Sequence, residues 1–256
     1  MKTNFSKRAR RWVILGAAVA VSVTYLWLFG DQTFLAFEAR AMARTLPFVK
    51  EIPVELSDSS VSLAPGRKLS YFGYEFEIPW DDVDDSKCRI VGGNKAIIAF
   101  LSGNVLSLWS WPPHEFANGV LSSIKMDPQK FRQLYGDAAL QSDYTFHRIM
   151  LGMTPDKVFP FTSKRQAHSD FALLLSKGIS GPPGALSGIY SVKAGEFRGF
   201  QFGRPQSSPG SVSIELYSDS TSLDFIFGQK ANGSTVISQA DINRILVTLR
   251  KSQPDI

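Results

Sequence analysis

The chain has 256 residues, of which 44% are hydrophobic and 20% charged, a composition that excludes a disordered or collagen-like protein. The net charge of +5 comes from the N-terminus, because the rest of the chain balances its basic and acidic residues. Five cations and no acid lie within residues 1–11: Lys2, Lys7, Arg8, Arg10 and Arg11. A body without excess positive charge argues against nucleic-acid binding.

An uncharged run of 18 residues, from Trp12 to Phe29, follows this basic tail. As an α-helix it is about 27 Å long, close to the ~30 Å thickness of a bilayer core. Trp12 at one end and Tyr25 and Trp27 at the other match the aromatic belts of membrane interfaces. The run 12–29 predicts a single-pass transmembrane helix. Since cations precede it, we expect tail 1–11 in the cytoplasm and the body outside the cell membrane, in the periplasm if the source is bacterial.

Two alternatives to an uncleaved anchor share the same sequence pattern. A secretory signal peptide also has a basic segment before an apolar one, but the small residues Ala39 and Ala41 lie far beyond the apolar run, which disfavours cleavage. A buried core helix is disfavoured by the five preceding cations. The sequence leaves open whether the N-terminal segment is cleaved.

Residues 30–68 are predicted to form a juxtamembrane helix and a linker. Four residues recur at three- and four-residue steps: Phe34, Phe37, Ala41 and Met42. This spacing predicts a helix over 32–46 that lies on lipid, pairs with a partner helix, or simply extends the membrane span. Pro47 ends it, and the prolines and serines of 47–68 are typical of a linker.

The body, residues 69–256, is predicted to be an α+β domain in which an antiparallel sheet packs with helices. Aromatic residues alternate over 72–80, which indicates a half-buried strand. Together with strands at 88–91, 96–101 and 105–111, joined by short glycine and asparagine turns, it is predicted to form a four-stranded antiparallel meander.

Residues 114–178 are predicted to be mainly helical. Asp127 followed by Pro128 indicates a helix start. A second helix is expected over 142–150, and Ser163 caps a third.

Strands return at 189–202, 211–217 and 222–227. Ser238 and Asp241 form a capping box for the last helix. Its apolar stripe is Ile242, Ile245, Leu246 and Leu249, which predicts one buried helix face.

Two segments resemble the Mog1/PsbP-type fold, an antiparallel sheet sandwiched between helices. One is the aromatic strand Tyr71–Pro79, which ends in Ile-Pro. The other is the pair of strands 211–217 and 222–227 with the helix Ala240–Leu249. The resemblance implies a binding or assembly module without a catalytic centre, which is an argument from fold analogy.

Three histidines, an acidic run and one cysteine are the candidates for chemistry. His114, His147 and His168 do not have the spacing of a helical metal pair. The run 81–85 lacks the glycine and glutamate of an EF-hand and predicts a solvated turn. Cys88 opens a short apolar strand, where we expect a buried, inert thiol. The sequence therefore indicates no catalytic, cofactor or metal site.

Aromatic residues are the remaining candidates for a ligand or partner surface: Phe76, Trp80, Trp109 and Trp111. A hydrophobic core is the competing interpretation. Trp109 and Trp111 share one face of their strand and Leu106 and Leu108 the other, which predicts a central strand covered on both faces.

These observations favour a membrane-anchored accessory or assembly module that binds a membrane or extracytoplasmic protein, and they favour it over an enzyme. A tethered carrier of an apolar ligand is the first alternative, and a deep cavity lined by Trp109 or Phe76 favours it. An envelope hydrolase is the second, and it requires two histidines and a carboxylate converging in a cleft.

Overall fold

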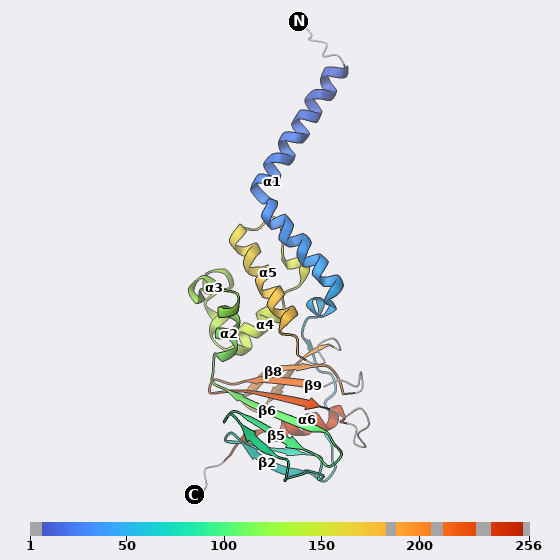
Figure 1. The fold of residues 1–256 in the computed structure, drawn as a ribbon, viewed down its shortest axis with the longest axis vertical. Helices are drawn as coiled ribbons and strands as arrows, with labels where there is room; N and C mark the ends of the chain where they lie inside the picture. The colour runs from blue at the N-terminus through green and yellow to red at the C-terminus, as the bar shows by residue number, and fades with distance from the viewer. Residues whose placement is uncertain (1–6, 183–187, 206–211, 229–236, 253–256) are drawn as a thin grey trace.

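The computed structural model describes residues 7–182, 188–205, 212–228 and 237–252, with side chains from Ala17 onward (Figure 1). The helices are α1 (Lys7–Thr45), α2 (Glu115–Ser123), α3 (Pro128–Tyr135), α4 (Asp143–Leu151), α5 (Lys164–Ile179) and α6 (Gln239–Thr248), with 3-10 turns η1 (Pro47–Lys50), η2 (Asp137–Leu140) and η3 (Pro155–Lys157). The strands are β1 (Val54–Glu55), β2 (Arg67–Tyr71), β3 (Tyr74–Ile78), β4 (Arg89–Val91), β5 (Lys95–Ala99), β6 (Val105–Trp111), β7 (Ile189–Ala194), β8 (Phe197–Phe202), β9 (Val212–Tyr217), β10 (Ser222–Gly228) and β11 (Arg250–Lys251).

The predicted α+β class is confirmed, with a large sheet packed against helices. This sheet has eight strands in the order β1-β7-β8-β9-β10-β6-β5-β4. It is mixed rather than antiparallel, because β1 pairs with β7 in parallel while the other neighbours are antiparallel. A second sheet of three strands has the order β11-β3-β2.

Two strand predictions are wrong in detail, and turn residues explain both. The predicted strand 72–80 begins inside a turn, since Phe72 and Gly73 have φ angles of 56° and 78°. The strand that remains, β3, belongs to the small sheet, so only β4, β5 and β6 form the meander. The predicted strand 189–202 is the hairpin β7–β8, which reverses next to Gly195 at φ 58°, a conformation that favours glycine.

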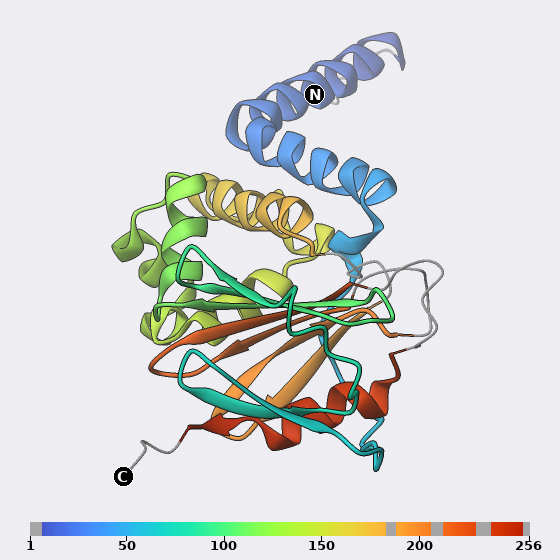
Figure 2. The same cartoon turned by 60° about the horizontal axis from the view of Figure 1, so that its bottom comes forward.

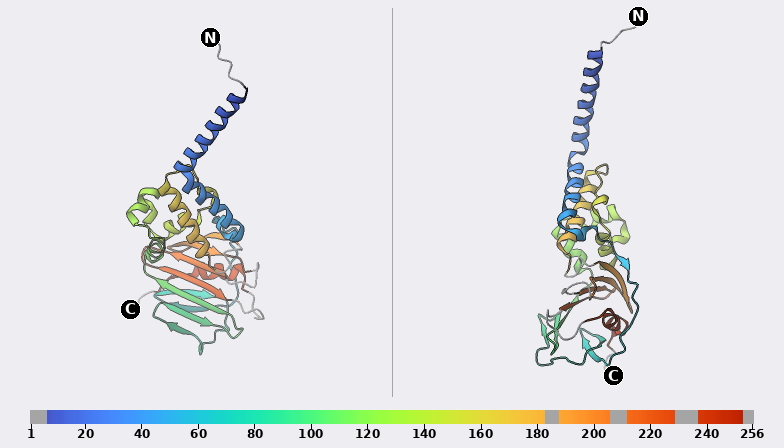
Figure 3. Two further views of the ribbon diagram at one scale, coloured as in Figure 1. Left: turned by 45° about the horizontal axis from the view of Figure 1, so that its top comes forward. Right: turned by 90° about the vertical axis from the view of Figure 1, so that its right-hand side faces the viewer.

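The molecule has three layers (Figures 2 and 3). Helices α2 to α5 lie on one side of the large sheet with the second half of α1 against α5, and α6 with the small sheet lies on the other side. Phe76, Phe225 and Ile245 lie in the core between the two sheets and α6. Helices α2 to α5 occupy the region 114–178, and their separate core includes Phe131 and Phe146. The helical layer thus has a hydrophobic core of its own, apart from the core between the sheets and α6.

The second half of α1 packs on α5 through small residues. Ala36, Ala39 and Ala43 are buried at helical spacing, and a Cβ on Gly178 of α5 would lie 3.9 Å from Met42 Sδ of α1. Small side chains let the two helices approach closely. Phe34 and Phe37 of the predicted stripe lie outside this contact and are exposed, so their predicted contact with lipid or a partner helix stays a prediction.

The first half of α1 projects away from the rest of the molecule (Figures 1 and 3). Its described apolar side chains are largely open, with Trp27 83% and Val21 69% exposed. Among the residues whose side chains are described, no helix holds a stretch long and apolar enough to cross a membrane. Residues 12–16 of the predicted span, and the whole predicted tail 1–11, lie outside that set.

A buried lysine joins the helical layer to the chain that leaves α1. Lys177 is fully buried, and its ammonium donates to four carbonyl oxygens at 2.5–3.2 Å: Val49, Glu51, Leu151 and Met153. The acceptors come from η1 and the residue after it, from the end of α4 and from the turn that follows α4. Charged donors make the stronger hydrogen bonds, so this lysine fixes three segments at one point.

The last helix agrees with its prediction. The Ser238 side chain accepts from the Asp241 N–H, and the Asp241 carboxylate accepts from the Ser238 N–H. The stripe of Ile242, Ile245, Leu246 and Leu249 is buried. A reciprocal cap satisfies two backbone donors and starts the helix at a fixed residue.

Candidate functional site

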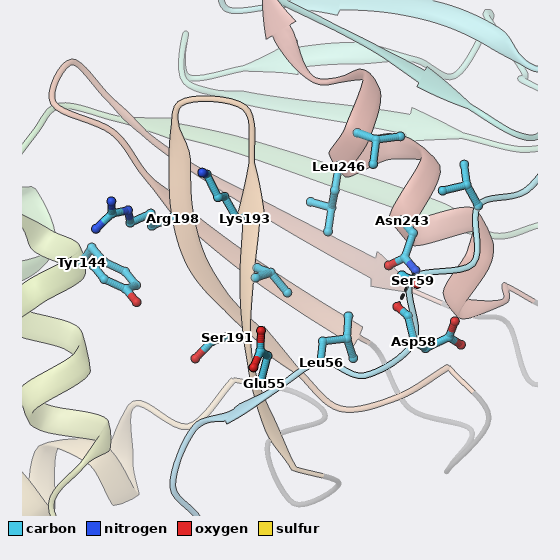
Figure 4. Close-up of a pocket in the computed structure, with 13 residues that line it drawn as sticks. Glu55, Leu56, Asp58, Ser59, Tyr144, Ser191, Lys193, Arg198, Asn243 and Leu246 are labelled. Atoms are coloured by element: carbon cyan, nitrogen blue, oxygen red, sulfur yellow. Dashed lines mark hydrogen bonds between the residues drawn. The ribbon is translucent and has the colours of Figure 1, made fainter.

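A groove of about 710 Å³ lies along the outer edge of β7 (Figure 4). The groove forms because β1 is short and leaves the rest of the β7 edge uncovered. Strand β1 pairs only Val54 with Tyr190 and Glu55 with Ser191. Beyond Ser191 no described strand pairs with this edge of β7. An unpaired edge presents backbone N–H and C=O groups to an added strand.

The two sides of the groove differ in chemistry because side chains alternate along a strand. Ser191 and Lys193 point to one side of β7, where Tyr144 of α4 and Arg198 of β8 also line the groove. Val192 points to the other side, where Leu246 and Val247 of α6 line it. One wall is polar and basic, and the other is apolar.

The segment after β1 is held against α6 and closes the far side of the groove. The Asn243 amide donates to the carbonyl oxygens of Asp58 and Ser60 at 2.8 Å. Arg244 donates to the carbonyls of Ser62 and Ala64. Hydrogen bonds to α6 thus fix the segment 58–64 that forms this side of the groove.

Charge is divided along the groove. Lys193 and Arg198 lie toward the turn of the β7–β8 hairpin, whereas Glu55 and Asp58 lie toward the opposite end (Figure 4). Hydrogen bonds from the Ser60 hydroxyl and N–H hold the pKa of Asp58 below its usual value. The Asp58 carboxylate therefore stays ionised at neutral pH.

The predicted aromatic surface does not hold together as one site. Phe76 and Trp80 are buried in the core between the sheets, because they alternate inward from the strand and its end. Trp109 and Trp111 stack on each other with centroids 5.4 Å apart and remain partly exposed. The prediction that β6 is covered on both faces is therefore wrong on the tryptophan face.

The candidates for chemistry are dispersed. His147 is buried and lies 2.8 Å from the Tyr217 hydroxyl, whereas His114 lies at the start of α2 and His168 within α5. The Cys88 thiol is only partly buried, in contrast to its prediction, and donates to the Asp84 carbonyl.

Carboxylates of the acidic run are held in surface ion pairs. Asp85 pairs with Arg67 at 2.8 Å and Asp84 with Lys87 at 2.7 Å. Within the described part of the chain, no three acidic, histidine or cysteine side chains are placed to hold a metal ion.

The sequence missed the groove because its lining is split among four segments far apart in the chain. A local signal existed: Lys193 and Arg198 flank a tight turn that contains Gly195. The sequence of that turn carries no information on the length of β1 or on the position of α6, and both are needed to form the groove. No protein-family model matches the chain, and comparisons with curated proteins and with solved structures give no match.

Proposed function

We propose that the protein is a membrane-anchored interaction module that binds an extended segment of a partner protein along β7. The observation that carries this proposal is the edge of β7 left open after Ser191, with a 710 Å³ groove beside it. Strand addition to an open edge is a recurring mode of peptide recognition. The binding role implied by the Mog1/PsbP resemblance is consistent with it, and that resemblance stays a prediction.

The walls of the groove define the partner's chemistry. A strand added to β7 places alternate side chains on opposite sides. One set meets Val192, Leu246 and Val247, and the other meets Lys193 and Arg198. The partner segment therefore alternates apolar residues with polar ones, and an acidic residue lies next to the basic end.

Peptide display on the full chain in detergent tests this proposal. We expect random extended octapeptides to be enriched in alternating apolar and acidic residues. The double substitution Lys193→Glu and Arg198→Glu is expected to weaken binding of the enriched peptides about tenfold, since like charges then meet across the interface.

The matched control is Arg89→Glu, an exposed strand cation in β4 at the opposite edge of the sheet. It is expected to leave peptide binding unchanged. Enrichment without alternation, or equal binding by the double variant and the wild type, contradicts the proposal.

Membrane attachment through residues 12–29 is the second part of the proposal. It is supported by the uncharged sequence of this segment and by exposed apolar side chains that no described part of the chain covers. Exposed apolar surface of this extent is typical of membrane or partner contact.

Aromatic rings at the base of the projecting half add to this argument. Phe161, from the loop between η3 and α5, lies 6.0 Å from Tyr25 and 5.6 Å from Phe29 between ring centroids. Phe159 contacts Phe161, and both are about half exposed. Aromatic side chains gather at the level of lipid headgroups, which is where the end of the span would place this cluster.

Replacing Lys7, Arg8, Arg10 and Arg11 with Ala is expected to scramble the orientation of the protein. Without the cationic flank, roughly half of the molecules should present the body on the cytoplasmic side. Protease accessibility of the body in inverted membrane vesicles measures this fraction.

The control removes four exposed cations of the body: Lys87, Arg89, Lys125 and Lys130. Unchanged protection of the tail variant, or recovery of the wild type as a soluble protein, contradicts the anchor.

The described residues support the two alternative functions less well than they support strand addition to β7. The cavity beside Trp80 has a volume of about 10 Å³, too small for an apolar ligand. Phe76 lies in a filled core. Among the described residues one histidine, His147, approaches a carboxylate, and no second histidine joins it.

A further inference from the structure

A second cavity, of about 320 Å³, lies on the helix-covered face of the large sheet. Its lining is acidic and aromatic: Trp111, Glu115, Phe116, Glu215, Tyr217, Ser222 and Asp224. This acidic cavity is separate from the groove beside β7, with which it shares no lining residue. Its volume falls at the lower end of the range for small-molecule sites.

Two carboxyl groups lie next to each other at the base of the acidic cavity. Asp224 of β10 is directly opposite Glu215 of β9, a cross-strand position that brings side chains close together. The Trp111 indole N–H donates to Asp224 at 2.8 Å, and the Tyr217 hydroxyl donates to Glu215 at 2.8 Å. Neighbouring donors thus orient both carboxyl groups without neutralising them.

No lysine or arginine among the described residues forms an ion pair with either carboxyl group. His147, 3.2 Å from Glu215, also lies 2.8 Å from the Tyr217 hydroxyl. Burial, together with the charge of Glu215, raises the pKa of Asp224 well above its usual value. Adjacent acids that are costly to ionise favour a cation placed between them.

The Ser222 hydroxyl is an independent sign of a ligand. Ser222 lines the cavity and is 3% exposed, and its Oγ has no hydrogen-bond partner among the described residues. A buried hydroxyl without a partner is costly. A donor inside the cavity removes that cost.

We infer that the acidic cavity binds a small organic ammonium ion, with its N–H groups directed to Glu215, Asp224 and Ser222. A primary ammonium has three N–H donors, which match these three acceptors in number. Its hydrocarbon part lies against Trp111 and Phe116, whose ring faces also attract a cation. The combination of acids and aromatic walls fits an alkylammonium better than a metal ion, which prefers a closed shell of oxygen ligands.

Titration calorimetry of the full chain in detergent with n-butylamine tests this inference, and n-butanol serves as the neutral probe of equal length. We expect saturable binding of the amine and none of the alcohol. Asp224→Asn keeps the shape of the side chain and is expected to weaken amine binding at least tenfold. Ser222→Ala is expected to weaken it several-fold. The matched control is Asp219→Asn, an exposed acid between β9 and β10, which should bind as the wild type does.

Far-UV circular dichroism establishes that each variant is folded before titration. Three results overturn the inference: no saturable heat with n-butylamine, equal affinity for amine and alcohol, or unchanged amine affinity in folded Asp224→Asn and Ser222→Ala. None of these results affects the proposed peptide groove, because its test uses different residues and a different ligand.

Discussion

Replacing Lys177 with Met is expected to lower the free energy of unfolding by about 3 kcal/mol, because buried carbonyl oxygens are left without their hydrogen-bond donor. The ammonium of Lys177 shares its three N–H groups among four carbonyl oxygens from two stretches of the chain, 49–51 and 151–153, and the side chain is fully buried. Methionine fills a similar volume but donates no hydrogen bond, so those carbonyls lose a shared donor. Chemical denaturation of the full chain in detergent measures the loss.

The control for this substitution is Lys130→Met, the same change at an exposed position of α3. It is expected to alter the unfolding free energy by less than about 0.5 kcal/mol. A loss of similar size in both variants contradicts a special role for Lys177.

Alkaline titration gives a second readout of the same residue. Burial lowers the pKa of Lys177 from 10.5 to about 8. Between these two values the unfolded chain binds more protons than the native chain, so the stability of the wild type rises with pH relative to Lys177→Met. The difference in melting temperature between the two proteins should widen from pH 8 to pH 10.5. A difference independent of pH contradicts the lowered pKa.

Replacing Ile245 with Asp is expected to cost about 4 kcal/mol or more and to unfold the body. Ile245 has no exposed surface and lies among side chains of both sheets and α6. In that position a carboxylate has neither water nor a basic partner. Loss of the cooperative transition in circular dichroism, or failure to recover folded protein, is the expected result.

Val247→Asp is the matched control, two residues further along the same helix. Val247 is 64% exposed, so the same new charge stays in water and should change the melting temperature little. Normal melting of Ile245→Asp would show that α6 does not pack as described.

Local signals in the sequence predicted the elements better than their arrangement. The capping box of Ser238 and Asp241 and the buried stripe of α6 depend only on residues close together in the sequence, and the structure confirms both. The split of the meander was not predictable in this way. Residues 72–80 alternate as strand β3 does, but nothing local says that β3 pairs with β2 and β11 rather than with β4.

The binding surfaces depended most on long-range contacts. Glu215 and Asp224 become neighbours only because β9 pairs with β10, and Val192 meets Leu246 only because α6 lies beside β7. For α1 the periodicity identified the stripe that contains Phe34 and Phe37, but it gave no sign that Ala36, Ala39 and Ala43 pack within the chain. The packing of α1 on α5 is thus a long-range contact that the local pattern did not predict.

The continuity of α1 has a mechanical consequence. One helix, Lys7–Thr45, joins the projecting half to the packed half, and it bends sharply between them (Figures 1 and 3). Adding a single residue to the projecting half turns the body about 100° around the axis of that half, because an α-helix has 3.6 residues per turn. The direction in which the β7 edge faces around this axis is therefore set by the number of residues in the projecting half of α1.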